Sequence, residues 1–297
     1  MSYQTQKKLL IFGFLFIPIA LLIMFLIYPF FRLIFMSLTD WDGVLPRYNF
    51  VGIDNFRDVF TDPTAWLSLR NNLYYVLGGL LQNMLGLLFA VFLARKFRGG
   101  NFFKAIIFLP FILNSVAVAY MFNYIFDYEH GPINLMLTHI GLSPIRFLSN
   151  IHIVNFSLAG ISLWRYLGFT MVVYISALQS VSEEIYESAT VDGANAWQSF
   201  RFITYPSIIR IVELNLFLTL SGSLNAFSEA LVLTKGGPDH ASSTFIVYTI
   251  DAFFKYNNYG LAAALSVVLL VLILIITAIQ RKLVIGDGGY ENNATLR

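Results

Sequence analysis

The sequence contains no cysteine among its 297 residues, and charged residues make up only 12% of it. Without thiols, a disulfide framework and a thiolate metal site are both excluded. The four histidines, His130, His139, His152 and His240, lack the close pair spacing of metal sites. A Gly-x-x-x-x-Gly-Lys-Ser/Thr run is also absent. The chain therefore has no loop of the usual kind for cradling ATP phosphates.

Hydrophobic residues, by contrast, fill 57% of the positions. Soluble domains carry roughly 25% charged residues, about twice the share found here. This composition predicts an integral membrane protein. The net charge is only +2, and the basic residues are scattered over loops. We therefore expect no nucleic-acid partner.

Long apolar runs divide the chain into membrane spans. A spanning helix needs about 20 apolar residues, and the stretches that qualify are about 10–36, 71–94, 104–126, 153–178, 208–233 and 260–280. We expect an all-α membrane protein in which residues 1–297 form a single transmembrane domain. The first run follows Lys7 and Lys8 as in a signal peptide, but it is too long and lacks a small-residue cleavage site, so it predicts a retained span.

Basic residues in short loops predict the orientation of these spans. Most of them fall on one side: Lys7, Lys8, Arg95, Lys96, Arg98, Lys104, Arg201, Arg210, Arg281, Lys282 and Arg297. The opposite loops hold Arg47, Arg57, Arg146, Lys235 and Lys255, with Arg70 at a boundary. We expect a multi-pass protein of the cell membrane with both termini in the cytoplasm.

A polar stretch at about 179–207 separates the fourth and fifth spans. Ser180 and Glu183 have the spacing of a capping box, and acidic residues occupy the first turns, where the helix dipole favours anions. Gly193 is a helix stop, and the second short helix is expected to end before Pro206. The stretch predicts a helical hairpin that presents a surface to a soluble partner.

Polar residues inside the spans are candidates for function. Arg165 lies midway along its span, about 18 Å from either end at 1.5 Å per residue. It is either a cation paired with a carboxylate on this chain or a partner, or a donor to a ligand. A continuous fifth helix would place Asn225 roughly 6 Å outward of its centre and Glu229 about 12 Å outward. Glu229 therefore either contacts a ligand or stands near the outer water boundary. Asn114 and Ser115 follow a proline that loosens the third span, which suits a cavity.

The hairpin resembles the "EAA" loop of ABC-importer permeases. The shared positions are Glu187, Ala189, Asp192, Gly193, Ala194, Phe200, Ile203, Thr204 and Pro206. Ser188 stands where that family usually has alanine. The resemblance implies that Glu187, Ala189, Asp192, Gly193 and Ala194 couple this chain to a separate ATPase.

A second match resembles the carbohydrate branch of these permeases. Asn225-Ala-Phe-Ser-Glu-Ala-Leu-Val-Leu-Thr-Lys-Gly-Gly-Pro238 follows the fifth span, and Tyr259-Gly-Leu-Ala-Ala-Ala-Leu-Ser266 opens the last. The resemblance implies a midplane ligand cavity lined by the third, fourth and fifth spans. The matching positions are Phe111, Ser115, Ser162, Arg165, Tyr166, Gly222, Asn225 and Ala226. Arg165 and Tyr166 replace smaller residues of well-known members.

The resemblance also implies the assembly: a second homologous permease, a cytoplasmic ATPase dimer that binds ATP and Mg, and an extracytoplasmic sugar-binding protein. No cofactor is expected in this chain, whose ligands are carbohydrate and membrane lipid. Alternatives are an importer of a non-sugar solute, which should lack the Leu-Thr-x-Gly-Gly-Pro segment, and an importer of an acidic sugar or sugar phosphate. A secondary transporter would need no ATPase-docking loop. An intramembrane enzyme would need a catalytic cluster that the spans do not contain.

Overall fold

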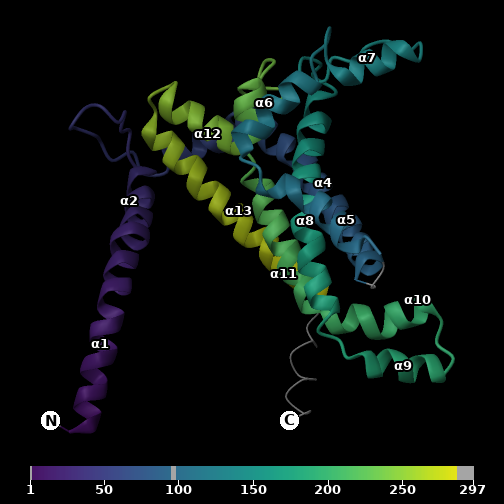
Figure 1. The fold of residues 1–297 in the computed structure, drawn as a ribbon. Coiled ribbons are helices and arrows are strands. Elements are labelled where there is room, and N and C mark those ends of the chain that lie inside the picture. Colours follow the sequence, from purple (N-terminus) through teal and green to yellow (C-terminus); the bar gives the residue numbers. More distant parts are fainter. Residues whose placement is uncertain (1, 95–97, 286–297) are drawn as a thin grey trace. The chain divides into compact units, whose positions relative to one another are not determined.

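The computed structural model describes residues 2–94 and 98–285 (Figure 1). Three basic residues used for the orientation, Arg95, Lys96 and Arg297, lie outside the described residues. Five helices are long and apolar enough to cross a membrane, and one bent pair supplies a sixth candidate. The expected all-α class is therefore confirmed. The chain forms two compact units, one of residues 1–62 and 249–269, the other of residues 63–248 and those beyond 269.

The first unit begins with a long apolar helix. It consists of α1 (Tyr3–Leu22), a π-helical turn (Ile23–Ile27) and α2 (Tyr28–Met36). A short helix α3 (Asp54–Thr61) follows. The Asn55 amide donates to the carbonyl oxygens of Ser37 at 3.0 Å and Thr39 at 2.8 Å, which ties α3 to the end of α2.

The second unit is built on α4 (Pro63–Leu93), α8 (Val154–Leu178) and α11 (Tyr205–Leu224), with α5 (Gly100–Ile112) packed on α8 (Figure 1). Gly168 stands at the crossing of α5 and α8. A Cβ there would collide with the backbone of Ile107 and Phe108. The two helices can therefore approach this closely only because residue 168 has no side chain.

Two apolar clusters hold the ends of this bundle. The first joins Leu93 near the end of α4, Ile175 near the end of α8 and Ile208 near the start of α11. The second joins the opposite ends, with Tyr75 from α4 and Val154 from α8. Hence α4 and α8 run in the same direction and α11 runs against them. This is the alternation that successive membrane crossings require.

The third expected span, 104–126, is not one helix. It consists of α5 and α6 (Ser115–Ile125), which meet at 101°. Pro110 removes a helical hydrogen bond from the last turn of α5. The Asn114 side chain then starts the new helix by accepting from the Val116 N–H at 2.9 Å.

The fifth expected span, 208–233, is also broken. Helix α11 ends at Leu224, and the Asn225 amide donates to the Ser221 carbonyl oxygen at 2.8 Å. Helical structure resumes at Ser228 and leads into a π-helical turn, Ala230–Thr234. The depths expected for Asn225 and Glu229 assumed a straight helix, so they do not apply.

The remaining long elements differ less from expectation. The first and second spans begin earlier, at Tyr3 and Pro63, and the sixth, α13, covers Tyr259–Ile285. The shorter helices α3, α7 (Pro132–His139) and α12 (Phe245–Phe254) were not predicted from the sequence.

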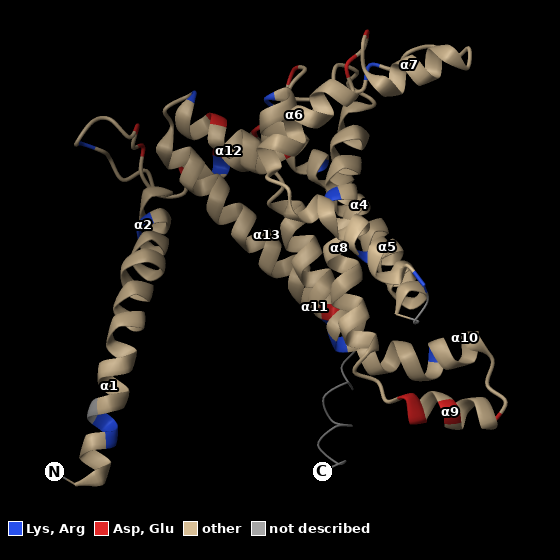
Figure 2. Cartoon of the chain, viewed as in Figure 1, with Lys and Arg blue, Asp and Glu red and all other residues tan. Residues whose placement is uncertain are grey.

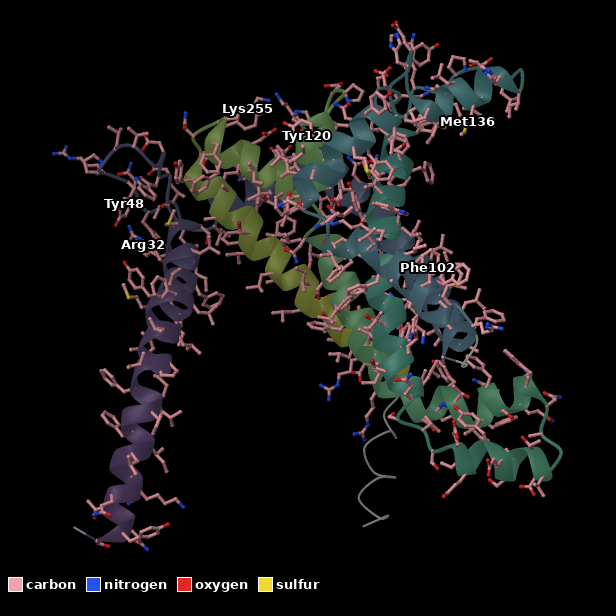
Figure 3. The ribbon with its side chains drawn as sticks, in the orientation of Figure 1. Arg32, Tyr48, Phe102, Tyr120, Met136 and Lys255 are labelled. Carbon is pink, nitrogen blue, oxygen red and sulfur yellow. The ribbon has the colours of Figure 1, made fainter. Side chains whose placement is uncertain are left out.

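The outer surfaces of the helices are apolar. Phe102 on α5, Tyr120 on α6 and Met136 on α7 are all exposed (Figure 3). The long helices are free of charge over most of their length, whereas α9 (Glu183–Val191) is acidic (Figure 2). Apolar surface of this extent requires lipid or a partner chain to cover it.

Candidate functional site

A cavity of about 340 Å³ lies in the second unit between α4, α8 and α11. Its volume falls in the range of roughly 300–1,000 Å³ that small-molecule sites occupy. The cavity lies between the two apolar clusters. Its lining residues are Tyr75, Gly79, Gln82, Phe111, Ser162, Tyr166, Phe169, Thr170, Asn215, Leu218, Thr219, Gly222, Ser223, Asn225, Ala226, Phe227, Ser228 and Glu229.

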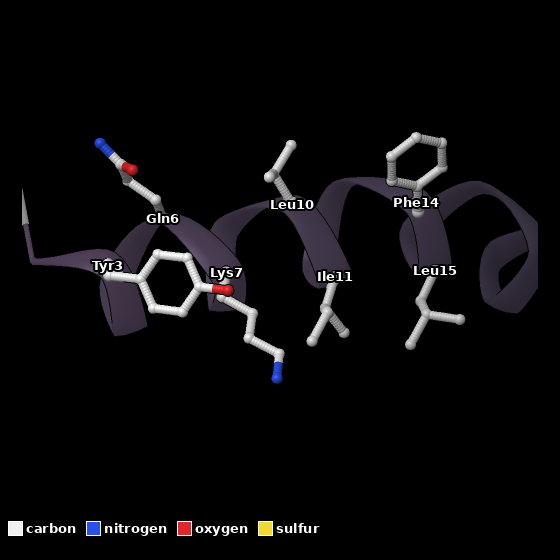
Figure 4. Close-up of a pocket in the computed structure, with 7 residues that line it drawn as sticks. All are labelled: Tyr3, Gln6, Lys7, Leu10, Ile11, Phe14 and Leu15. Carbon is white, nitrogen blue, oxygen red and sulfur yellow. The ribbon is translucent and has the colours of Figure 1, made fainter.

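A second hollow runs along α1 and is lined by one helix alone (Figure 4). Its residues are Tyr3, Gln6, Lys7, Leu10, Ile11, Phe14 and Leu15. All of them are exposed, and no described residue from another element closes the hollow. A single helix face cannot enclose a small ligand, so the cavity in the bundle is the candidate site.

The structure brings most of the sequence-predicted ligand residues to this cavity. They are Phe111, Ser162, Tyr166, Gly222, Asn225, Ala226 and Glu229. Asn114, Ser115 and Arg165 are not among the described residues of the lining. Asn114 is the N-cap of α6, and Ser115 is the first residue of that helix. The break in the third span makes them the start of another helix, and their contact with a ligand stays a prediction.

The wall supplied by α4 was missed. Tyr75, Gly79 and Gln82 line the cavity, although the resemblance implied only the third, fourth and fifth spans. A signal was present, because α4 carries four amide side chains within its apolar run, at Asn71, Asn72, Gln82 and Asn83. Amides are costly against lipid, so they indicate a helix face that packs on protein.

A buried polar network joins α4, α8 and α11 beside the cavity. Gln82 donates to the Thr170 hydroxyl at 2.7 Å, and Asn83 donates to the Thr219 hydroxyl at 2.8 Å. The Asn83 Oδ1 atom accepts from the Tyr174 hydroxyl at 2.8 Å and from the Asn215 amide at 3.2 Å. Two hydrophobic end clusters therefore enclose a polar middle layer.

One wall of the cavity is aromatic. The Phe111 ring stacks on Phe169 with centroids 4.8 Å apart and planes inclined at 26°. The Tyr166 ring meets Phe111 edge-on at 6.0 Å. Aromatic faces suit the apolar faces of sugar rings, whereas hydroxyls and amides suit their edges.

Two buried polar atoms of the lining lack a partner among the described residues. They are the hydroxyl of Tyr75, which is 2% exposed, and the Oδ1 atom of Asn215, which is 1% exposed. Buried polar groups are nearly always hydrogen-bonded, so an orphan in a cavity wall indicates water or a bound ligand.

Arg165 forms an ion pair with Glu229, with 3.6 Å between Nη1 and Oε1. The Glu229 side chain is buried, at 7% exposure, and the Arg165 side chain is half-buried, at 13% exposure. Arg165 Nη2 also donates to the Leu113 carbonyl oxygen at 3.4 Å, at the break between α5 and α6. The carboxylate partner of Arg165 thus lies on this chain. Glu229 is 5% exposed and lines the cavity.

The polar hairpin consists of α9, a turn and α10 (Ala196–Ser199). Gly193 has φ +81° and lies in the left-handed region that favours glycine. Glu187, Asp192 and Gly193 are exposed, Ala194 is half-buried and Ala189 is buried. The structure shows the expected helical hairpin.

Two local expectations for the hairpin are wrong. The N-cap of α9 is Ser182, because the Ser180 hydroxyl donates instead to the Ala177 carbonyl oxygen at 2.7 Å. The capping box stands at the second helix, where Asn195 and Gln198 exchange hydrogen bonds at 2.9 and 2.8 Å. Pro206 also does not follow a helix end, because a π-helical turn, Phe200–Thr204, carries α10 into α11.

Comparison with known proteins gives one consistent result. The family model "Binding-protein-dependent transport system inner membrane component" matches residues 82–284. The probable ABC transporter permease protein YurN of Bacillus subtilis is 31% identical, over 94% of this chain and 97% of YurN. The multiple sugar-binding transport system permease protein MsmF of Streptococcus mutans is 29% identical, over 91% and 93% of the two chains.

The fold has a close counterpart among solved structures. A chain in the crystal structure of a bacterial ABC transporter involved in the import of the acidic polysaccharide alginate superposes with a TM-score of 0.84. The match covers 96% of this chain and 98% of that chain, at 23% identity.

Proposed function

The chain belongs to the family of binding-protein-dependent transport system inner membrane components, and from this premise we propose that it is a permease subunit that imports an oligosaccharide or a related sugar. As a permease component it is multi-pass, and the ATPase that drives it is a separate subunit. The cavity between the two apolar clusters is the ligand site of this proposal.

The composition of the cavity wall is the observation that carries the sugar assignment. Stacked rings at Phe111 and Phe169 face a lining rich in hydroxyls and amides. The unpartnered Tyr75 hydroxyl and Asn215 carbonyl oxygen add a donor and an acceptor. Sugars offer apolar ring faces and many hydroxyls, so the two sets are complementary. MsmF, whose name refers to sugar binding, supports the same class.

The proposed mechanism is alternating access. A second homologous permease completes the pore, and an ATPase dimer binds ATP and Mg on the cytoplasmic side, where both termini of this chain lie. The hairpin residues Glu187, Ala189, Asp192, Gly193 and Ala194 contact the ATPase. Closure of the ATPase dimer moves the hairpin. The first apolar cluster, which contains Leu93, Ile175 and Ile208, then packs more tightly and closes the cytoplasmic end of the bundle. The opposite end opens beneath a docked sugar-binding protein.

The hairpin has the chemistry of a docking surface. Ile185, Val191 and Trp197 are exposed, Val191 at 88%. The Tyr186 hydroxyl lies 3.0 Å from the Thr204 hydroxyl, which ties α9 to the π-helical turn that leads into α11. Movement of α9 therefore has a direct mechanical route to the helix that lines the cavity.

Reconstitution tests this function. The complex of both permeases, the ATPase and the binding protein is placed in proteoliposomes, and ATP hydrolysis and uptake are measured with a panel of neutral oligosaccharides, uronate oligosaccharides, phosphate, polyamines and short peptides. We expect uptake of a sugar and ATP hydrolysis stimulated by the sugar-loaded binding protein. Stimulation by a non-sugar solute alone would overturn the proposal.

A further inference from the structure

The cavity wall carries a single charge among its described residues, the carboxylate of Glu229. Arg165, the cation nearest to it, does not line the cavity. All other described lining residues are uncharged. The charged group that lines the cavity is therefore an anion, and its cationic partner stands behind it.

The Arg165 guanidinium is already engaged. Nη1 lies 3.6 Å from Glu229, Nη2 donates to the Leu113 carbonyl oxygen at 3.4 Å, and Cζ lies 5.2 Å from the Tyr166 ring centroid. Recognition of a ligand carboxylate by arginine uses a fork of two parallel N–H groups. The buried Nε atom of Arg165 has no partner among the described residues, and both Nη atoms already contact protein oxygens. Either fork of the guanidinium includes an Nη atom, so a ligand carboxylate would have to compete with Glu229 or with the Leu113 carbonyl oxygen.

Freeing the guanidinium for a ligand would leave Glu229, which is 5% exposed, as an uncompensated buried carboxylate. Breaking a buried pair in this way is strongly unfavourable. A negatively charged ligand would in addition face the Glu229 carboxylate between walls of protein, where like charges repel more strongly than in bulk water. Both effects oppose the binding of an anion.

We propose that Glu229 is a specificity-determining residue, which neutralises Arg165 and makes this wall of the cavity accept uncharged sugars and disfavour anionic ones. The assignment rests on the proposed sugar-import function. It distinguishes this chain from an importer of uronates or sugar phosphates.

Because the chain contains no cysteine, an introduced cysteine is its single thiol, and the rates at which charged reagents modify that thiol report the charge of the cavity wall. A Ser162→Cys variant places one thiol in the cavity lining. In the assembled complex in nanodiscs, the thiol is modified with a trimethylammonium-ethyl or a sulfonato-ethyl methanethiosulfonate, and the rates are read by mass spectrometry of this chain. We expect Glu229→Gln to lower the cation-to-anion rate ratio by about fivefold or more, because it removes a unit negative charge near the thiol.

Two matched controls make the measurement specific. Ser188→Cys lies on the exposed hairpin, and its rate ratio should be the same with and without the Glu229→Gln substitution. The double variant Arg165→Gln with Glu229→Gln leaves no unpaired buried charge and guards against misfolding. It should also lower the ratio at Ser162→Cys, because the carboxylate and not the guanidinium faces the cavity.

A second experiment measures ligand binding by protection of the same thiol. Trigalacturonate, an anionic trisaccharide, is added, and we measure how far it slows the modification of Ser162→Cys by the uncharged reagent methyl methanethiosulfonate. Protection should be at least about threefold greater in the Glu229→Gln background. An unchanged rate ratio, or equal protection in both backgrounds, would overturn the inference and leave sugar uptake standing. Absence of sugar uptake would overturn the proposed function and leave the rate ratio standing.

Discussion

At the scale of single residues, Arg165 shows how a cation is accommodated in an apolar helix. Its charge is balanced by Glu229, one N–H group is satisfied by the Leu113 carbonyl oxygen, and its flat face approaches Tyr166. These contacts join α8 to both helix breaks, the one at 113–114 and the one at 225–227. The ion pair therefore links the parts of the bundle whose backbone is irregular.

Arg165→Ala should destabilise the protein by about 3 kcal/mol, because it leaves the Glu229 carboxylate buried and unpaired. The double variant Arg165→Met with Glu229→Gln should regain most of the loss. The measurement is denaturant or thermal unfolding of the purified complex in detergent. Equal destabilisation of the single and double variants would show that the charge of Glu229 is not the cause.

The Asn83 network gives a second test at this scale. Asn83→Leu removes the hydrogen bonds to Tyr174, Asn215 and Thr219. Interhelical hydrogen bonds in membranes contribute on average about 0.6 kcal/mol and at most about 1.7, so we expect a loss of about 1–2 kcal/mol. Met84→Leu, at the exposed neighbouring position, should leave the unfolding free energy unchanged. A loss of unfolding free energy no larger than that of the control would show that the hydrogen bonds of Asn83 do not stabilise the fold.

Sequence reasoning placed residues well where their chemistry is unusual for a membrane and poorly where the backbone departs from a helix. Arg165 and Glu229 were singled out from burial cost, and Glu229 lines the cavity while Arg165 is its ion-pair partner. Asn114 caps α6, a role that was not foreseen for its side chain. Tyr75 was missed because a tyrosine in an apolar run has no distinctive signature.

At the scale of elements, two helices of the described chain contain a π-helical turn directly before a Tyr-Pro pair. One turn precedes Tyr28-Pro29 in the first unit, and the other precedes Tyr205-Pro206 in the second. The amide of each tyrosine donates to a carbonyl five residues earlier, Ile23 or Phe200. A proline lacks an N–H group and its ring clashes with the preceding turn, and the wider π turn lets the helix continue. The expectation that the helix ends before Pro206 was therefore wrong.

Pro206→Ala should restore a regular α-helix in this region. A π turn holds one residue more than an α turn. Its conversion to α-helix would therefore shift the helical register by one residue and rotate α10 by about 100° relative to α11. We expect ATP hydrolysis to lose its stimulation by the loaded binding protein while expression is retained. Pro29→Ala is the matched control, because it alters the same device in a helix that carries no hairpin. Normal stimulation in Pro206→Ala would separate the π turn from coupling.

Gly193 tests the turn of the hairpin. Its φ of +81° disfavours residues with a Cβ, but no described atom lies within 4 Å of the Cβ position. Only backbone strain, or a partner, can therefore penalise a substitution. We expect Gly193→Val to be inserted normally and to uncouple transport, and Gly193→Asn to remain largely active, because asparagine tolerates the left-handed region. Uptake and stimulated ATP hydrolysis are the readouts, and full activity of the valine variant would exclude this turn from the docking surface.

At the scale of the whole molecule, hydropathy was sufficient for the helical class. Within the second unit, the end clusters show that α4 and α8 run against α11, the alternation expected of consecutive spans. The orientation in the membrane stays a prediction from loop charge. The breaks at 113–114 and 225–227 were not predicted, because the stretches 104–126 and 208–233 are each long enough to be taken as one continuous span. Such breaks depend on contacts between distant residues, Arg165 with Leu113 and Glu229 among them.

The predicted orientation can be tested with the same cysteine-free chain. Helix α8 has 25 residues, about 38 Å at 1.5 Å per residue, enough to cross a hydrocarbon core of about 30 Å. Ser143→Cys lies before it and Ser188→Cys after it, both exposed. A membrane-impermeant maleimide applied to intact cells, with the outer membrane permeabilised where one is present, should label Ser143→Cys only. In inverted vesicles it should label Ser188→Cys and Ser2→Cys. Labelling of Ser2→Cys and Ser188→Cys from opposite sides would require an odd number of crossings between them, and the bent pair α5–α6 would then have to enter and leave the membrane on the same face.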